Sequence, residues 1–577
     1  MTKRQDIIQF AISLLILGVA FFICQLVFAK IDLTEEKRHT LTEATTELLD
    51  SVDNQVLVRC YLHGDFPAKF KRLEKAIKER LDEFHDLSGG RVEYEFIDPY
   101  AIDDKKTQGE IETALYEQGL EFTRLSYEEN GVKKFKTIWP GAIMSHNGKE
   151  LAVQLFKSNS PEPTDAMVNG SINNIEFELG SKMRQLMSSK RKSVAFIEGH
   201  GELSELETID LGNYLAESYE VSRVQIDEKI GSLSEKLDHV KHRTNSYDLL
   251  IIAKPDSIFS DKDKVIIDQY IMNGGKILWL LDPILTDLDS LRERQGTMGI
   301  TNEMGLYDML FDYGVRLNRD MVIDYQCAPI AFDAGPMGNQ RNMEMFNWYF
   351  SPVVIAPDNA HPIAANLDPI VMQFTSSLES VGDDKRVQKS VLLASSDLSK
   401  QLKAPIRVNS GVVQLGIDYF QANPNPNLAL AMLLEGTFTS NFQYRLPDAI
   451  QNDPTIAFRE ESVHTKMIVV ADGDIARNGI MDGGEGPIPV PLGYDRYIGN
   501  VVYDNREFLL NAVNYLLDDK ALISMRSRSI ILRKLNEEKI LQERSRWQVI
   551  NVALPLFLLI VFGVLQFTIR KKKYASH

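Results

Sequence analysis

The sequence predicts a membrane-anchored α/β protein in which two α/β domains lie between two membrane spans. Three observations lead to this prediction. An uncharged apolar run lies close to each end of the chain. Between these runs, two long stretches alternate strand and helix patterns, which is typical of α/β sheets. The length of 577 residues also exceeds what one hydrophobic core can organise, so several domains are expected.

The composition is that of a globular protein and argues against several other classes of protein. Apolar residues make up 44% and charged residues 25% of the chain, which is ordinary for a globular protein. The net charge of −17 argues against a non-specific nucleic-acid binder, because such a protein needs a basic face to neutralise phosphates. The three cysteines, Cys24, Cys60 and Cys327, include no CxxC pair, so neither a disulfide framework nor a cysteine-based zinc site is predicted.

The two apolar runs are residues 7–28 and 549–569. Each can cross a hydrocarbon core about 30 Å thick at a rise of about 1.5 Å per residue. Two buried core helices are an alternative, and so is a removable signal peptide for the first run, since Lys3 and Arg4 precede it. Two spans place both termini on one side of the membrane. The basic tail Arg570–Lys573 favours the cytoplasm for the termini, so the large domain is expected outside it.

The first α/β domain begins with a helix that Thr40 or Thr42 can cap. A strand at 56–62 follows, and then a helix that starts near Pro67 and repeats apolar residues at three-to-four spacing. A second strand lies within 91–99. A strand, a helix and a strand with a crossover of this length predict parallel pairing.

A hairpin completes this first domain. The stretch FKTIWPGAIMSHNGKELAVQLF has Asn147-Gly148 at its turn, which is a strong hairpin signal. The order of elements predicts a thioredoxin-like domain. Because the chain has no CxxC pair, thiol redox chemistry is not predicted for it.

The second α/β domain begins at residue 193 with the apolar run Val194–Ile197. Helices are expected at about 205–218 and directly after Ser260, which can cap the second one. Apolar runs within 247–255 and 276–283 read as buried strands. Strands and helices of these lengths predict a doubly wound parallel sheet.

The chain is therefore expected to have eight parts in sequence. They are an N-terminal transmembrane anchor (1–30), a thioredoxin-like α/β domain (31–165), a linking helix (166–192), the first part of the second α/β domain (193–325), a strand-rich insertion (326–460), the return of that domain (461–522), a juxtamembrane stalk helix (523–548) and a C-terminal transmembrane helix (549–570).

The stretch FIEGHGELSE, residues 196–205, carries Glu198, His200 and Glu202 at the end of the first strand of the second domain. In doubly wound sheets the carboxyl ends of the strands form a crevice, so these side chains are candidates for a site. A hydrolase would need a nucleophile on a strand-to-helix elbow, and the chain has no G-x-S-x-G. Three side chains from one strand end cannot all converge on a metal ion, so no metal is predicted.

The structural interpretation of this stretch is a tight βα turn. Gly199 and Gly201 allow positive φ, and Glu202 or Ser204 can serve the start of the next helix. A contact with a partner or a small ligand is the intermediate interpretation, in which His200 is a contact residue. A degenerate hydrolase that uses His200 and a carboxylate is an alternative.

Further polar residues follow other strands of the same sheet. Asp282, Asp472, Asp474 and Asn478 join the stretch 196–205 as a candidate contact or ligand loop. Asp472 and Asp474 lack EF-hand spacing, and capping of a strand-end loop is the alternative for Asp474 and Asn478. No phosphate-loop or dinucleotide fingerprint exists in the chain, so no cofactor is predicted.

Several stretches together resemble the GldG family, the gliding-motility-associated, ABC-transporter substrate-binding-like proteins of Bacteroidota. The stretches that carry the resemblance are IDLTEEKRHTLTEAT after the first span, FDYGVRLNRDMVID, HPIAANLDPI, LLEGTFTSNF, and NREFLLNAVNYLLDD before the last span. The resemblance implies an amidotransferase-like fold for the second α/β domain. The amidotransferase cysteine is not present, and the family implies no catalytic residues to transfer.

The resemblance also implies a function. It predicts a non-enzymatic, periplasm-facing subunit of an ABC transporter-type inner-membrane complex that supports gliding motility or type 9 secretion. The expected partners are a GldF-like permease and a cytoplasmic GldA-like ATPase, with a homodimer within the complex as a further expectation and no nucleic acid. A periplasmic small-ligand receptor is the third interpretation.

Overall fold

The protein is described from a computed structural model. The described residues are 12–16, 18, 41–101, 104–129, 132–156, 163–188, 191–237, 242–286, 296–337, 340–357, 360–365, 367–382, 385–484, 486–517 and 537–574. The chain forms two compact units, Met1–Ser529 and Ile530–His577. The expected first span lies outside the described residues apart from 12–16 and 18, which are helical, and so does the first half of the expected stalk.

The N-terminal domain is built on a four-stranded sheet in the order β2-β1-β5-β6. Its strands are β1 (Val56–Cys60), β2 (Val92–Phe96), β5 (Gly141–His146) and β6 (Lys149–Gln154). Strand β1 pairs parallel with β2 and antiparallel with β5, so the predicted parallel pairing is confirmed. The hairpin turn is confirmed as well, because Asn147 and Gly148 have φ values of 50° and 78°, as a type I′ turn requires.

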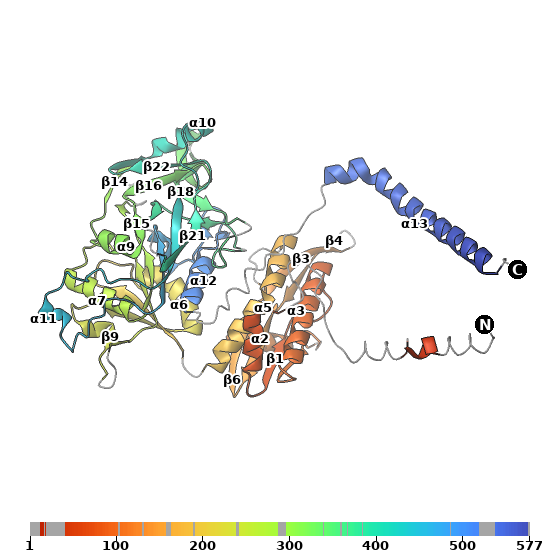
Figure 1. Ribbon diagram of the computed structural model, residues 1–577. Coiled ribbons are helices and arrows are strands. Elements are labelled where there is room, and N and C mark those ends of the chain that lie inside the picture. Colours follow the sequence, from red (N-terminus) through yellow and green to blue (C-terminus); the bar gives the residue numbers. More distant parts are fainter. Residues whose placement is uncertain are drawn as a thin grey trace. The chain divides into compact units, whose positions relative to one another are not determined.

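Helices cover both faces of this sheet. They are α2 (Glu43–Asp50), α3 (Ala68–Leu87), α4 (Lys105–Glu117) and α5 (Asp165–Met187). Thr42 caps α2 by accepting a hydrogen bond from the Thr45 amide, and the five apolar residues of α3 at three-to-four spacing are all buried. Helices α2, α3 and α5 lie side by side (Figure 1) and share one core with the sheet. Leu115 of α4 joins a separate cluster. The expected linking helix is α5.

One hairpin of this domain was not predicted. Strands β3 (Thr123–Glu129) and β4 (Val132–Ile138) pair with each other. Residues 135–138 therefore belong to this hairpin rather than to the one that turns at Asn147. Pro140 separates the two hairpins, because Trp139 and Pro140 lie between β4 and β5 and belong to neither strand.

The large domain contains a nine-stranded sheet with the path β15-β20-β24-β25-β12-β11-β7-β8 and β21 beside β24. Its strands are β7 (Ser193–Glu198), β8 (Glu220–Gln225), β11 (Leu249–Ala253), β12 (Lys276–Leu280), β15 (Val315–Leu317), β20 (Leu378–Ser380), β21 (Val387–Ala394), β24 (Ala429–Gly436) and β25 (Thr465–Val470). The strands β8, β7, β11, β12 and β25 pair in parallel. The return of the chain to this sheet at 465–470 is confirmed.

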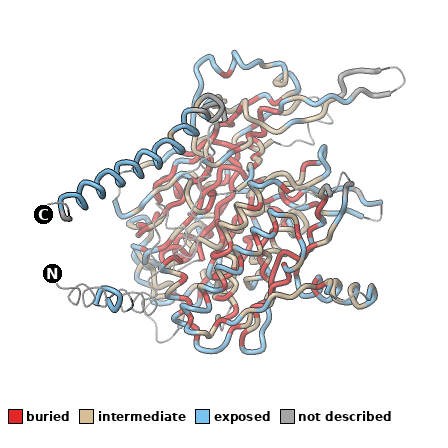
Figure 2. The backbone as a smooth tube through the Cα atoms, turned by 90° about the vertical axis from the view of Figure 1, so that its right-hand side faces the viewer, coloured by how far each residue is buried: buried red, intermediate tan, exposed pale blue. Residues whose placement is uncertain are grey.

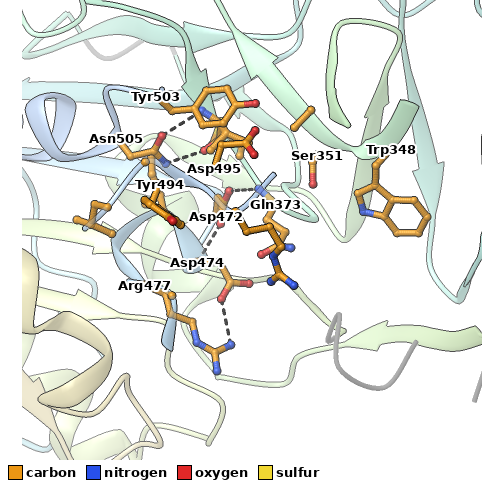
Figure 3. Close-up of a pocket in the computed structure, with 18 of the residues that line it drawn as sticks. Trp348, Ser351, Gln373, Asp472, Asp474, Arg477, Tyr494, Asp495, Tyr503 and Asn505 are labelled. Carbon is orange, nitrogen blue, oxygen red and sulfur yellow. Dashed lines mark hydrogen bonds and ion pairs between the residues drawn. The ribbon is translucent and has the colours of Figure 1, made fainter. Parts of the chain in front are cut away.

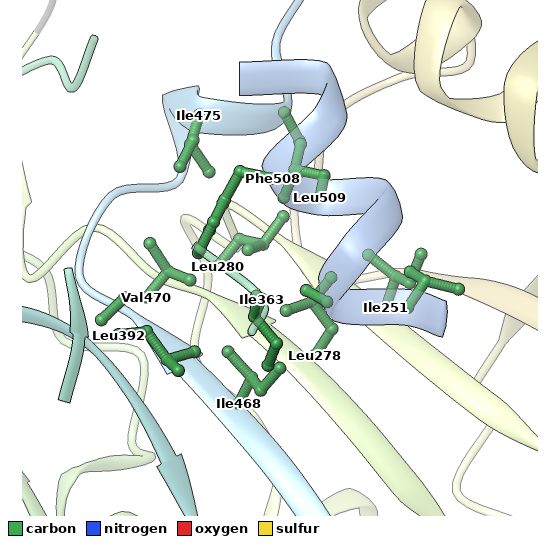
Figure 4. Close-up of a cluster of buried hydrophobic side chains, with 14 of the residues drawn as sticks. Ile251, Leu278, Leu280, Ile363, Leu392, Ile468, Val470, Ile475, Phe508 and Leu509 are labelled. Atoms are coloured by element: carbon green, nitrogen blue, oxygen red, sulfur yellow. The ribbon is translucent and has the colours of Figure 1, made fainter. Parts of the chain in front are cut away.

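Successive residues of the central strands point to opposite faces, and each face has its own helices. Helices α6 (Ile209–Ser218) and α12 (Asn505–Leu517) cover one face, and α7 (Asp261–Met272) and α9 (Tyr307–Tyr313) cover the other. On the first face, Phe508 and Leu509 of α12 pack over Leu278 and Ile468 of the sheet (Figure 4). The sheet is thus doubly wound over its parallel part, as predicted.

The predicted insertion, 326–460, is not separate from the sheet. Its strands β20, β21 and β24 extend the sheet beyond β25, and residues 431–436 of β24 pair antiparallel with the whole of β25. The reason is the apolar sequence of β24, ALAMLLEG, which is buried at nearly every position and needs cover on both faces. The sheet is therefore mixed rather than parallel throughout.

The rest of the predicted insertion forms small sheets with their own aromatic core. They contain β13 (Ile284–Leu285), β14 (Gly296–Thr301), β16 (Asp320–Asp324), β17 (Cys327–Met337), β18 (Gln340–Val354), β19 (Ile370–Val371), β22 (Ser399–Lys403) and β23 (Ile406–Asn409). The first three of these strands lie before residue 326, so the small sheets begin earlier in the chain than the predicted insertion. Trp348, Tyr349 and Phe350 of β18 lie in this core. The expectation of a strand-rich region is confirmed.

The C-terminal unit contains α13 (Glu537–Tyr574). Within it, Arg546–Lys572 is long and apolar enough to cross a membrane, and it is the one helix with this property among the described residues. Figure 2 shows α13 exposed along its described length, whereas buried residues concentrate in the strands of the domains. A helix of this length and composition fits a lipid environment.

Candidate functional site

Four loops at the carboxyl ends of parallel strands meet at one edge of the large sheet. They follow β7, β11, β12 and β25. Numbered along the chain, the parallel strands have the spatial order 2-1-3-4-5, with the reversal between β7 and β11. In doubly wound sheets of this order, ligands bind at the carboxyl edge. The residues at this edge are therefore the candidates for a site.

His200, in the loop after β7, is only 5% exposed. Its ring stacks on Phe259, with 3.7 Å between the ring centroids and 12° between the planes. Its Nε2 lies 3.2 Å from Oδ2 of Asp263, near the start of α7, and its Nδ1 lies 3.3 Å from Oε1 of Glu202. Burial lowers the pKa of His200, but hydrogen bonds and charge from these two carboxylates outweigh burial and raise it. The imidazole thus joins two loops within the fold.

The backbone around His200 is a tight turn, as the structural interpretation predicts. Gly199 and Gly201 have φ values of 117° and 75°. The carbonyl of His200 accepts hydrogen bonds from the amides of Asp256 and Ser257, each 3.0 Å long, which attaches this turn to the loop after β11. Since the ring and the carbonyl of His200 are both engaged internally, the geometry favours a structural role over a catalytic one.

One expectation for this turn, that Glu202 serves the start of the next helix, is corrected, and another, that Glu198, His200 and Glu202 do not all converge, is confirmed. Glu202 does not serve the next helix, because its Oε2 accepts a 2.7 Å hydrogen bond from the amide of His200. Glu207 bonds Ser204 instead, through both the amide and the hydroxyl. Glu198 lies apart from His200 and pairs with Arg223 of β8. The three polar residues of the stretch therefore do not form one cluster.

A second group of charges lies at the ends of β11, β12 and β25. Lys254 Nζ is 3.2 Å from Asp282 Oδ2 and 2.5 Å from Asp474 Oδ1. Asp282 also accepts a hydrogen bond from the Gly473 amide. Asp472 accepts from the amides of Gln373 at 2.6 Å and of Asp474 at 2.8 Å. The structure thus brings together Asp282, which follows β12, and Asp472 and Asp474, which both follow β25.

Burial has the largest effect on the pKa values of this group of charged residues. Burial raises the pKa of Asp282 to about 6, against the opposing effect of Lys254. Burial and the neighbouring carboxylates of Asp282 and Asp474 raise the pKa of Asp472 well above its usual range. For Lys254, burial favours the neutral amine, but the charges of Asp282 and Asp474 outweigh burial and raise the pKa. The group holds more negative than positive charge in a buried place.

Asn478 lies at the edge of this group and has a structural role. Its Nδ2 donates to the carbonyl of Leu206, and its Oδ1 accepts from the amide of Asp210. It therefore holds the loop after β25 against the start of α6, consistent with the capping alternative.

A pocket of about 230 Å³ opens beside Asp472 and Asp474 (Figure 3). Its lining comes from the loop after β25, from the start of β17, from the end of β19 and the residues after it, from β18, and from the segment 491–505. The polar and aromatic lining residues are Trp348, Ser351, Gln373, Asp472, Asp474, Arg477, Tyr494, Asp495, Arg496, Tyr497, Tyr503 and Asn505. His200, Glu198 and Glu202 are not among them. The pocket lies at the sheet edge, but away from the stretch that the sequence singled out.

The sequence missed the positive partners of these carboxylates. Lys254 follows an apolar strand directly, and Arg477 follows Asp474 by three residues. A charged residue that follows a buried strand is expected at the carboxyl edge of the sheet. This pattern holds for Lys254 as well as for Asp282 and Asp472, so it also predicts Lys254 at this edge. The aromatic wall from β18 gave no such signal, because β18 lies in a region without α/β periodicity.

Comparisons with known proteins match most of the chain to two domain families. Residues 35–145 match a domain family of unknown function, DUF7088. No curated protein matches the chain. The solved structure of the mmIFT52 N-terminal domain aligns with 13% identity over 56% of this chain and 97% of its own length, but its TM-score of 0.30 is too low to support an argument about fold.

The large domain has a clear family assignment. Residues 191–512 match the family described as an ABC-type uncharacterized transport system. The match spans more than half of the chain, from the strand before His200 into α12, and it includes the charged group and the pocket. The chain therefore belongs to this ABC-type transport family, and it is an ABC transporter-associated protein.

Proposed function

We propose that the chain is a non-enzymatic subunit of an ABC transporter-type inner-membrane complex of the GldG kind, supporting gliding motility or type 9 secretion. The observation that carries the proposal is the match of residues 191–512 to an ABC-type transport family. The apolar helix within α13 supports a fixed place in a membrane. The stretches that resemble the GldG family support the link to gliding.

The proposed topology has two spans, with both termini in the cytoplasm and the large domain in the periplasm. The basic residues Arg570–Lys573 at the end of α13 support a cytoplasmic C-terminus. The first span, at 7–28, rests on its uncharged sequence.

The proposed folds of the two domains are thioredoxin-like and amidotransferase-like. The first is supported by the order β2-β1-β5-β6, with α3 joining two parallel strands and an antiparallel hairpin beside them. The second is supported by the doubly wound order of the parallel strands. A non-enzymatic role is supported by the two described cysteines: Cys60 is buried within β1, and Cys327 lies on β17, whose pairing partner is β18 and not a strand of the large sheet.

The partners that we propose are a GldF-like permease and a GldA-like ATPase, with a homodimer of this chain inside the complex. The test is purification of the tagged chain from native membranes in a mild detergent, followed by quantitative mass spectrometry. We expect the permease and the ATPase to co-purify in fixed ratio. A matched inner-membrane protein with a tag of the same kind is the control, and recovery of the chain without either partner would refute the proposal.

A small-ligand receptor is a second candidate function, and the pocket beside Asp472 favours it. A pocket of about 230 Å³ that combines buried carboxylates with aromatic side chains is suited to a small polar molecule. This function is compatible with the first, since a subunit of a transport complex can also report on a ligand.

A further inference from the structure

The pocket beside Asp472 is lined by three carboxylates, Asp472, Asp474 and Asp495, and by only two guanidinium groups, Arg477 and Arg496. Asp472 is fully buried, and its two carboxylate oxygens accept hydrogen bonds from the amides of Gln373 and Asp474. Among the described residues, no Lys, Arg or His side chain lies within 4.0 Å of its carboxylate. Lys254 is already shared by Asp282 and Asp474. A buried carboxylate without a cation is unfavourable unless a charge from elsewhere compensates it.

The neighbouring charges do not remove this imbalance. Arg477 contacts Asp474 at 3.6 Å, but it is also paired with Glu207 at 2.9 Å. Two positive side chains, Lys254 and Arg477, thus serve the carboxylates of Glu207, Asp282 and Asp474 before Asp472 is considered. Burial and the adjacent carboxylates raise the pKa of Asp472, and they outweigh the opposing charge of Lys254, which lies beyond ion-pair distance of Asp472. A bound cation would supply the missing charge.

The wall of the pocket presents an unused hydrogen-bond donor. Trp348 is 2% exposed, and its Nε1 has no hydrogen-bond partner within the described part of the chain. Figure 3 shows the indole nitrogen on the edge of the ring nearer Ser351, at the rim of the pocket. A buried indole N–H normally finds an acceptor, so a ligand oxygen at this position would satisfy it.

The remaining walls suit an organic cation. Tyr494 and Tyr503 line the pocket together with Trp348, and aromatic faces attract ammonium and guanidinium groups. A volume of about 230 Å³ is smaller than the pockets of drug-sized ligands, which are about 300–1,000 Å³. Among the residues that the structure describes, no group of three or more His, Cys, Asp or Glu side chains is arranged for a metal ion. These features favour an organic cation over a metal.

We propose that this pocket binds a small organic cation, an amine or guanidinium compound whose positive group lies against Asp472 and whose acceptor oxygen takes the N–H of Trp348. The proposal rests on the receptor function above and gives it a ligand class. It does not depend on the assembly of the chain with a permease, because all of its residues belong to the large domain.

The test uses the full-length chain in detergent and two probes that differ in one group. N-acetyl-L-argininamide carries a guanidinium and carbonyl oxygens, and N-acetyl-L-citrullinamide replaces the guanidinium with a neutral ureido group of nearly the same shape. Isothermal titration calorimetry gives the Kd of each. We expect saturable binding of the arginine compound, at least tenfold tighter than that of the citrulline compound. Equal binding of the two, or no binding of either, overturns the proposal.

Two variants locate the binding site, and each has a matched control. Asp472→Asn removes the charge and is expected to weaken binding of the arginine compound at least tenfold. Its control is Asp320→Asn, since Asp320 is also buried and accepts a backbone hydrogen bond, from Ser377, but lies outside the pocket lining. Thermal unfolding of each variant shows whether it is folded. Unchanged binding in folded Asp472→Asn overturns the proposed site.

A second variant, Trp348→Phe, tests the binding site even if Asp472→Asn does not fold. Trp348→Phe keeps an aromatic ring and removes only a donor that has no partner within the described chain, so folding should persist. Binding is expected to weaken about fivefold. The control is Trp279→Phe, because the Nε1 of Trp279 is also buried and unpartnered among the described residues but lies in the sheet core, away from the pocket. If Trp348→Phe and Trp279→Phe weaken binding of the arginine compound equally, the proposed role of Trp348 is overturned.

The failure of this proposal can be told apart from the failure of the proposed complex. Binding is measured on the purified chain, whereas the complex is measured by co-purification. A chain that brings down its permease but does not bind the arginine compound would retain the first function and exclude this ligand class.

Discussion

Replacing His200 by Phe is expected to destabilise the large domain while keeping a ring in its core. The Phe side chain can retain the stack on Phe259, which His200 makes with a centroid distance of 3.7 Å. It cannot retain the contacts to Glu202 and Asp263. The side chains of these two carboxylates are 2% and 7% exposed, so water cannot replace the imidazole. The variant isolates the polar contribution of His200 from its packing.

The magnitude follows from the two carboxylates that are left behind. Removing one partner of a buried charged pair typically costs about 3–5 kcal/mol. Each carboxylate keeps one other hydrogen bond, Asp263 from the Ser260 hydroxyl and Glu202 from the backbone of residue 200, so we take about 3 kcal/mol, at the low end. For a domain of this size, this corresponds to a fall in Tm of about 6–12 °C, at about 2–4 °C per kcal/mol.

The pH dependence gives a second readout with a defined sign. The carboxylates raise the pKa of His200 in the folded state against the opposing effect of burial. A histidine with a raised pKa stabilises the fold fully below its unfolded pKa of about 6.5, and this contribution is lost as the pH rises through the folded pKa. The Tm difference between wild type and His200→Phe is therefore expected to be larger at pH 6 than at pH 9.

The assay is thermal unfolding of the full-length protein in detergent, followed by tryptophan fluorescence. Replacement of the exposed His464 by Phe is the control and should leave Tm unchanged. A His200→Phe variant with wild-type Tm at both pH values would refute the structural role of the imidazole. Loss of motility without a change in Tm would instead identify His200 as a contact residue.

Three further predictions follow from single positions. Gly201→Ala should cost about 1–3 kcal/mol, because the φ of +75° is unfavourable for a side chain and its Cβ would lie 1.7 Å from Asp256 Oδ1; Gly231→Ala, with open space around it, is the matched control by thermal unfolding. Burial raises the pKa of Asp504 to about 6, so its contribution to stability falls as the pH rises from about 4 to about 6, and Asp504→Asn should gain up to about 3 kcal/mol relative to wild type at pH 7 but not at pH 4. A parallel Tm change in the two proteins across this range would contradict that assignment. A green fluorescent protein fused after Tyr574 should fluoresce, because the basic end of α13 is expected in the cytoplasm, and a dark but expressed fusion would contradict the topology.

Local elements could be predicted because their signals are short-range. The apolar spacing in α3 and the Ser260 cap of α7 each involve residues less than five positions apart. The Asn147-Gly148 turn is equally local. The parallel pairing of the strands in the large sheet could also be predicted, since strand and helix lengths restrict the connections, but their spatial order came from the structure. These features survive in the structure with their predicted bounds nearly unchanged.

The extension of the sheet by β24 could not be predicted in the same way. Its apolar run fits a buried strand in any sheet, and an antiparallel partner can lie at any distance along the chain. The β3–β4 hairpin was missed for a different reason. Its strands are polar on one side and lie next to the stronger hairpin signal at Asn147-Gly148. Residues 135–138 were therefore assigned to that second hairpin.

The sequence by itself determined the doubly wound character of the large domain, the apolar C-terminal helix, and the placement of His200, Asp282, Asp472 and Asp474 at strand ends. Only the tertiary structure decided what those residues contact. Asp263 lies 63 residues from His200, and Gln373 lies 99 residues from Asp472. The periodicity of apolar residues predicts which face of a helix or strand is buried. It does not predict which distant residue contacts a buried charged side chain, because that contact depends on how separate elements pack.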